Sequence, residues 1–118
     1  MRVLIADDSS TMRAILMRSL AAIGTHGAIE AADGEEALAL FKPGWFDLVL
    51  TDWNMPGKNG LEVVRAIRAQ DAQVPIIMVT TTAEKHQVMQ AIAAGVSDYL
   101  IKPFTADKLR EKLLRYCG

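Results

Sequence analysis

The chain has 118 residues, of which 51% are hydrophobic, and 13 basic against 14 acidic side chains leave a formal net charge of −1. This length predicts one domain, residues 1–118, and the even charge balance gives no basic surface for nucleic acid or anionic lipid. No apolar run approaches the roughly 18 residues that a membrane-crossing helix needs, so we expect no membrane insertion. The N-terminus lacks a signal peptide's apolar core, and the lone Cys117 fits a reducing compartment, so we expect a cytoplasmic protein.

The first predicted elements are a short apolar strand over Val3–Ala6 and the helix that follows it. The acidic pair Asp7-Asp8 closes the strand, and the serine pair Ser9-Ser10 offers helix N-caps. Apolar residues then recur at helical spacing as far as Ile23. A weaker strand is expected from about His26 to Glu30.

The middle of the chain predicts a second helix and a fully buried strand. Asp33 and Glu36 have the spacing of a capping box and open the helix. The apolar run that begins at Phe46 is typical of a strand buried on both faces. Asp52 follows this strand directly, and Pro56-Gly57 stops regular structure soon afterwards.

The next segment repeats this alternation. Asn59 is placed to cap a third helix, and an apolar strand over residues 76–79 runs into three threonines that begin at Thr80. A fourth helix is expected from about Glu84 to Ala94. We expect it to turn one apolar face inward, made of Val88, Ala91 and Ile92.

A last short strand, Asp98–Ile101, is ended by Lys102-Pro103, and Thr105 caps a final helix. The basic residues of this helix are expected mostly on its outer side: Lys108, Arg110, Lys112 and Arg115. Five strands thus alternate with five helices, and the short connections make each crossover a parallel βαβ unit. The sequence predicts an α/β fold, a doubly wound (βα)5 domain with a five-stranded parallel sheet.

In a parallel sheet, all carboxyl ends of the strands lie at one edge, where ligands bind. The residues at those ends are Asp7, Asp8, Asp52, Thr80 and Lys102. Three carboxylates close together repel one another unless a cation joins them, and hard oxygen ligands suit Mg²⁺. A carboxylate nucleophile, a divalent metal, a lysine and a hydroxyl together suit phosphoryl transfer to an aspartate.

Four segments carry a resemblance to a known family: LIADDSSTMR, LVLTDWNMPGKNGLEVVRAIR, IIMVTTTAEK and AGVSDYLIKPF. In this order they resemble the receiver domain of two-component response regulators, and most closely the single-domain chemotaxis regulators of the CheY type. The resemblance implies a flavodoxin-like sheet with strand order 2-1-3-4-5, for which this family is itself a standard example.

The resemblance also assigns roles at the site. It implies that Asp52 accepts a phosphoryl group from a phosphohistidine on a histidine kinase. It implies Mg²⁺ as cofactor, bound directly by Asp8, Asp52 and the main-chain carbonyl of Asn54, with Asp7 acting through water.

Three further residues gain roles by the resemblance. Lys102 binds the phosphoryl group and couples to Asp52 when that group is absent. Thr80 moves toward a phosphoryl oxygen, and Tyr99 turns inward behind it. The Lys102-Pro103 peptide bond is expected to be cis, as is usual in the family.

The function implied is that of a signalling module rather than an enzyme, although the phosphoacceptor assists its own phosphorylation and dephosphorylation. Phosphorylation then switches the face formed by the fourth helix, fifth strand and fifth helix, which binds a target such as a flagellar motor switch or a relay protein. We expect a monomer that does not bind nucleic acid.

Two alternatives stay open at this point. The first is a receiver domain excised from a larger hybrid kinase or transcription factor. The second is an aspartate-nucleophile phosphatase of the haloacid dehalogenase kind, which uses similar metal chemistry. Such enzymes place a D-x-D pattern after the first strand, whereas this chain has the adjacent pair Asp7-Asp8 and no segment long enough for a cap domain.

Overall fold

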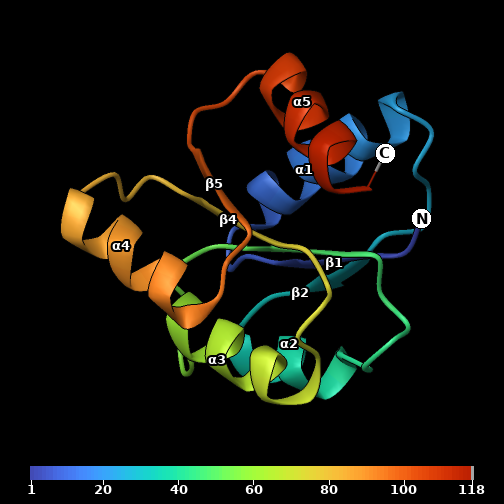
Figure 1. Ribbon diagram of the computed structural model, residues 1–118. Coiled ribbons are helices and arrows are strands. Elements are labelled where there is room, and N and C mark those ends of the chain that lie inside the picture. The colour runs from blue at the N-terminus through green and yellow to red at the C-terminus, as the bar shows by residue number, and fades with distance from the viewer. Residues whose placement is uncertain (118) are drawn as a thin grey trace.

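A computed structural model describes residues 1–117 of the protein, and its centre is a parallel sheet with helices on both faces (Figure 1). The strands are β1 (Val3–Ala6), β2 (Ile29–Ala31), β3 (Leu48–Thr51), β4 (Ile76–Thr80) and β5 (Asp98–Ile101). The helices are α1 (Ser10–Ala22), α2 (Gly34–Leu40), α3 (Gly60–Gln70), α4 (Lys85–Ala94) and α5 (Ala106–Cys117). Among residues 1–117, no helix is long and apolar enough to cross a bilayer.

The strand order is β2-β1-β3-β4-β5 with every pair parallel, which confirms the expected doubly wound topology. The register pairs Ala6 with Thr51 at the carboxyl ends of β1 and β3. Because Asp52 directly follows Thr51, this pairing brings it level with Asp7. The strand order and register alone therefore place Asp7 and Asp52 side by side.

Each face of the sheet is covered by its own group of helices. In Figure 1, α1 and α5 lie on one face, and α2, α3 and α4 lie on the other. Alternate residues of β1 serve the two cores: Val3 and Ile5 join the core under α1 and α5, while Leu4 and Ala6 join the opposite core. Burial on both faces explains why the strands read as continuous apolar runs rather than as alternating patterns.

Side chains cap four of the helices as the sequence predicts. Their oxygens accept main-chain N–H groups three residues later, and the capping residues are Ser9, Asp33, Asn59 and Thr105. Each such cap contributes about 1 kcal/mol to helix stability. Helix α4 has no side-chain cap at its N-terminus, and it ends at Gly95 with φ of 117°, a left-handed conformation that favours glycine.

Two local predictions were wrong. Strand β2 begins at Ile29 instead of near His26, because Gly27 has φ of 77° and the Thr25 N–H still bonds to the Leu20 carbonyl beyond the end of α1. Such a backbone cannot extend into a strand.

The second concerns α4, where Ala91 is buried and Val88 half-buried, but Ile92 is 59% exposed. Helix α4 packs beside α3 at one side of the molecule (Figure 1), so only a narrow stripe of it meets the core.

Candidate functional site

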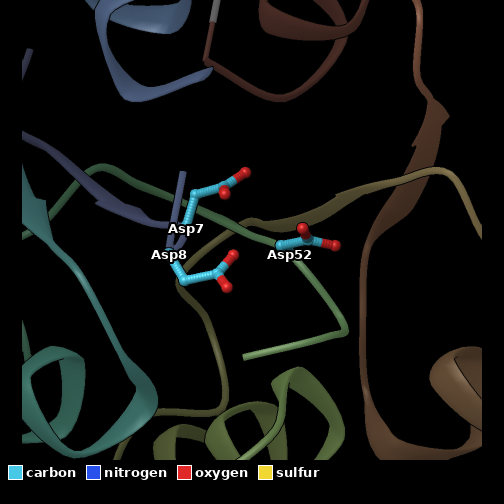
Figure 2. A group of neighbouring side chains, drawn as sticks. All are labelled: Asp7, Asp8 and Asp52. Carbon is cyan, nitrogen blue, oxygen red and sulfur yellow. The ribbon is translucent and has the colours of Figure 1, made fainter. Parts of the chain in front are cut away.

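Three carboxylates meet at the carboxyl edge of the sheet. Asp7 and Asp8 follow β1, Asp52 follows β3, and one oxygen of each lies within 4.8 Å of the others. Figure 2 shows the three side chains gathered around the ends of these two strands. Asp7 and Asp52 are buried, whereas Asp8 is exposed. The expected convergence is therefore observed, and two of the three acids lie out of bulk water.

Asp7 is held by hydrogen bonds on every side. Its Oδ1 accepts the Ser9 N–H at 2.9 Å, and its Oδ2 accepts the Lys102 ammonium at 2.7 Å. Its own N–H donates to the Ala31 carbonyl at 3.1 Å, and its carbonyl accepts Nη1 of Arg13 at 2.7 Å. Both main-chain polar groups and both carboxylate oxygens thus have partners, which fixes the direction of this side chain.

Lys102 joins two of the acids. Its Nζ lies 2.7 Å from Asp7 Oδ2 and 3.0 Å from Asp52 Oδ2, and its side chain is only 10% exposed. Burial by itself lowers the pKa of Lys102, but the hydrogen bonds and charges of the two carboxylates outweigh it and raise the pKa above its ordinary value. The ammonium is therefore charged at neutral pH and balances part of the negative charge.

The main chain of Lys102 also contributes, since its N–H donates to the Thr80 carbonyl at 2.9 Å. The Lys102-Pro103 peptide bond is cis, which confirms that expectation.

The loop after β3 shapes the surroundings of Asp52. Asp52 Oδ1 accepts the N–H of Trp53 at 2.6 Å, so both carboxylate oxygens of Asp52 have donors. The Gly60 N–H, at the start of α3, donates to the Trp53 carbonyl at 2.7 Å. A Cβ on Gly60 would collide with the Asp52 carbonyl oxygen and with Cα of Trp53. This close approach requires glycine and fixes the loop against α3.

Two groups at the site have oxygens that accept no hydrogen bond from the described residues. Among residues 1–117, neither the Asp8 carboxylate nor the main-chain carbonyl of Asn54 accepts a hydrogen bond, and both residues are exposed. Together with Asp52 they offer hard oxygen donors with two negative charges, a set that fits Mg²⁺.

The two residues expected to switch meet at a loop rather than at the acids. Thr80 is buried, and its Oγ1 accepts the Thr82 N–H at 3.3 Å. The Tyr99 hydroxyl donates to the Thr82 carbonyl at 2.7 Å. Burial, and then the negative charge of Asp52, raise the pKa of Tyr99. Both side chains are thereby connected through one residue of the segment between β4 and α4.

Sequence reasoning missed Arg13, which reaches the site from α1. Its guanidinium bonds to the Asp7 carbonyl and also to Glu30 of β2, with Nε 3.1 Å from Glu30 Oε1. The one sequence signal is a basic residue in the first turn of a helix, where the helix dipole disfavours a cation.

A hollow of about 950 Å³ lies elsewhere, lined by residues that include Gly44, Asp71 and Tyr116. Asp7, Asp8 and Asp52 do not line it. The position of the acids therefore follows from the strand ends and not from the shape of the surface.

Comparisons with known proteins give a consistent result. A family model described as the response regulator receiver domain matches residues 3–114. Chemotaxis protein CheY-3 of Vibrio cholerae serotype O1 is 46% identical over 115 residues, which cover 96% of this chain and 88% of the relative. Chemotaxis protein CheY of Pseudomonas aeruginosa is 45% identical and covers 96% and 93% of the two chains. The crystal structure of CheY4 of Vibrio cholerae at low pH superimposes with a TM-score of 0.89, at 36% identity and with 98% and 97% of the two chains covered.

Proposed function

The chain belongs to the response regulator receiver domain family and is a chemotaxis response regulator, and we propose that Asp52 is the residue on which it accepts a phosphoryl group. One observation carries this proposal. The Asp52 carboxylate lies beside those of Asp7 and Asp8 and within 3.0 Å of the Lys102 ammonium. We take residues 1–118 as one receiver domain, active as a monomer.

Mg²⁺ is part of the proposal. Asp8, Asp52 and the main-chain carbonyl of Asn54 would hold it directly, and Asp7 would act through water. The uncommitted oxygens of Asp8 and Asn54 support this set. When bound, the metal would offset negative charge both on the carboxylates and on the incoming phosphoryl oxygens.

The chain's own residues position the reacting carboxylate. An Asp52 oxygen attacks phosphorus, the P–N bond of the donor phosphohistidine breaks, and the imidazole leaves with the electron pair of that bond. Trp53 N–H holds Asp52 Oδ1 and limits rotation of the carboxylate. Lys102 exchanges its contact with Asp52 Oδ2 for a phosphoryl oxygen, while its bond to Asp7 keeps the ammonium in place.

The switch follows from the loop between β4 and α4. In the proposal, the Thr80 hydroxyl moves toward a phosphoryl oxygen and Tyr99 packs behind it, which changes the α4-β5-α5 face. Exposed apolar side chains on this face support a protein target: Met89, Ile92 and Ile101. The partners are then a histidine kinase as phosphodonor and a flagellar motor switch or relay protein as target, in the cytoplasm.

Acetyl phosphate tests the acceptor assignment without the kinase. The chain, incubated with acetyl phosphate and Mg²⁺, should gain one phosphoryl group by mass spectrometry and lose it in hydroxylamine. Asp52→Ala should gain none. Asp107→Ala is a matched control, because it removes an exposed carboxylate from the first turn of α5 and should be phosphorylated like the parent chain.

Two results would contradict the proposal. The first is an Asp52→Ala chain that still gains the hydroxylamine-labile mass. The second is steady release of inorganic phosphate from many small phosphate esters, which would favour the phosphatase reading.

A further inference from the structure

We propose that Arg13 is a positioning residue for the metal site, and that it acts by fixing the peptide group between Asp7 and Asp8. This inference rests on the proposed function, because it takes Asp8 as a metal ligand. Arg13 touches none of the reacting atoms. Its contact is with the carbonyl oxygen of Asp7, at 2.7 Å from Nη1.

The two acids of the pair are held in different ways. The Asp7 carboxylate has its own donors, Ser9 N–H and the Lys102 ammonium. The Asp8 carboxylate accepts no hydrogen bond from residues 1–117 and is exposed. The direction of the Asp8 side chain therefore depends on the backbone that carries it, and the Asp7 carbonyl belongs to the peptide group directly before Asp8.

Arg13 is itself held in place. Its side chain is 16% exposed, and its Nε lies 3.1 Å from Glu30 Oε1 on β2. Its own N–H bonds to the Ser9 carbonyl within the first helical turn. A planar guanidinium with two fixed partners presents its remaining N–H groups in one direction, which a flexible ammonium does not do. Arg13 thus links α1, the end of β1 and β2 at the point where the acids leave the sheet.

The charge preference of a helix N-terminus does not explain why a cation occupies the Arg13 position. The first turn of a helix carries partial positive charge, and α1 has no acidic side chain in that turn to offset it. The guanidinium also adds positive charge near a proposed cation site. By Coulomb's law alone, its removal should strengthen Mg²⁺ binding. A positioning role predicts instead that removing Arg13 weakens Mg²⁺ binding. The two effects change the affinity in opposite directions, and this makes the inference testable.

The experiment measures the Kd for Mg²⁺ by Trp53 fluorescence in the full chain. A Trp45→Phe background removes the second tryptophan, whose ring lies under the Arg2 guanidinium and packs edge-on against Phe46. In Arg13→Gln we expect Mg²⁺ binding roughly 10-fold weaker, in the range found when groups that orient a metal ligand are removed. In Arg13→Lys, which keeps the charge, we expect at least threefold weaker binding.

Arg18→Gln is the matched control, because it removes the same charge from an exposed position on α1 and should leave the Kd within twofold. Titrations are made at a temperature where circular dichroism shows every variant folded without Mg²⁺. A purely structural role would lower the thermal midpoint and leave the Kd unchanged. If Arg13→Gln does not fold, Arg13→Lys decides the question alone.

Binding at least threefold weaker in each folded Arg13 variant supports the inference. A Kd that is less than threefold weaker, unchanged or tighter overturns it. Asp8→Asn separates this result from the parent proposal. If Asp8→Asn loses Mg²⁺ binding while the Arg13 variants bind normally, only the inference about Arg13 fails. If Asp8→Asn binds Mg²⁺ like the parent chain, the metal assignment itself fails.

Discussion

The Tyr99 hydroxyl and the Thr82 carbonyl are joined by a 2.7 Å hydrogen bond, and this bond ties β5 to the segment that leads into α4. The Thr82 N–H bonds in turn to Thr80 Oγ1. Helix α4 begins at Lys85 without a side-chain cap, and the Tyr99–Thr82 bond holds the segment three residues before that start. A change at Tyr99 therefore alters contacts both at the proposed switch residue Thr80 and on the proposed α4-β5-α5 target face.

Tyr99→Phe removes this bond and keeps the ring. We expect the free energy of unfolding to fall by about 1 kcal/mol, because one partly buried hydrogen bond is lost. Amide hydrogen exchange should become faster in residues 81–86. Tyr116→Phe, which loses the hydroxyl bonds to Ser97 and Asp98, should leave exchange in that segment unchanged. Equal exchange in Tyr99→Phe and the parent chain would contradict the role given to this bond.

Lys102→Met removes the ammonium that balances two buried carboxylates. Without Mg²⁺ we expect the free energy of unfolding to fall by about 3 kcal/mol, since breaking a buried ion pair leaves uncompensated charge. The rise of the thermal midpoint on adding Mg²⁺ should exceed that of the parent chain. Lys108→Met, an exposed lysine of α5, serves as control. A Lys102→Met protein as stable as its parent in the absence of Mg²⁺ would refute this prediction.

The difference in the free energy of unfolding between the parent chain and Lys102→Met should depend on pH in a definite direction. The pKa of Lys102 is raised in the folded protein, so the stability it contributes is fully present below its unfolded pKa of about 10.4. That contribution is lost as the pH rises through the folded pKa. The gap between the parent chain and Lys102→Met should stay constant around neutral pH and close only in strong alkali.

Gly60→Ala tests the close approach of α3 to the loop after β3. The added Cβ must displace the Asp52 carbonyl, so we expect the free energy of unfolding to fall by about 2 kcal/mol and Mg²⁺ binding to weaken. Gly44→Ala is the control. Gly44 has φ of 76° and open space around it, so alanine there should cost about 1 kcal/mol and leave Mg²⁺ binding intact. Normal Mg²⁺ binding by Gly60→Ala would show that the loop tolerates displacement.

Asp98→Asn should destabilise the protein in a pH-dependent way. Burial alone raises the pKa of Asp98, but the Tyr99 N–H, Lys112 and Tyr116 outweigh it and lower the pKa below its ordinary value. Stability from such a group is present above its unfolded pKa of about 3.9 and is lost as the pH falls through the folded pKa. We therefore expect Asp98→Asn to lose about 1–2 kcal/mol at pH 7 in urea unfolding.

That deficit should shrink as the pH falls below about 4. Glu111→Gln, which removes an exposed acid of α5, should change stability little at pH 7, because its ion pair with Lys108 is exposed. A deficit of Asp98→Asn that stays constant down to acid unfolding would contradict the prediction.

Local and topological signals made much of this molecule predictable. A cap such as Ser9 or Asn59 is visible in sequence because donor and acceptor lie three residues apart. The convergence of Asp7 and Asp52 was predictable because parallel strands bring their carboxyl ends to one edge. Neither prediction needed to know how any helix packs.

The errors and omissions concern contacts between distant segments. Ile92 has helical spacing with buried neighbours, yet the position of α4 at the side of the molecule leaves it exposed. The contact of Arg13 with Glu30 joins residues 17 positions apart, and its contact with Asp7 is to a main-chain oxygen. No spacing rule predicts a bond from a long side chain to a backbone atom across elements. The close approach of Gly60 to the Asp52 carbonyl likewise cannot be predicted from sequence, because it depends on the conformation of the loop between them.

The bridge made by Lys102 spans 95 residues to Asp7 and 50 residues to Asp52. During synthesis, all three acids leave the ribosome well before the lysine that balances two of them. Closing loops of this length carries an entropic cost that only the completed sheet offsets. The bridge therefore cannot form in a nascent chain that ends before residue 102, and the site is finished only when β5 joins the sheet.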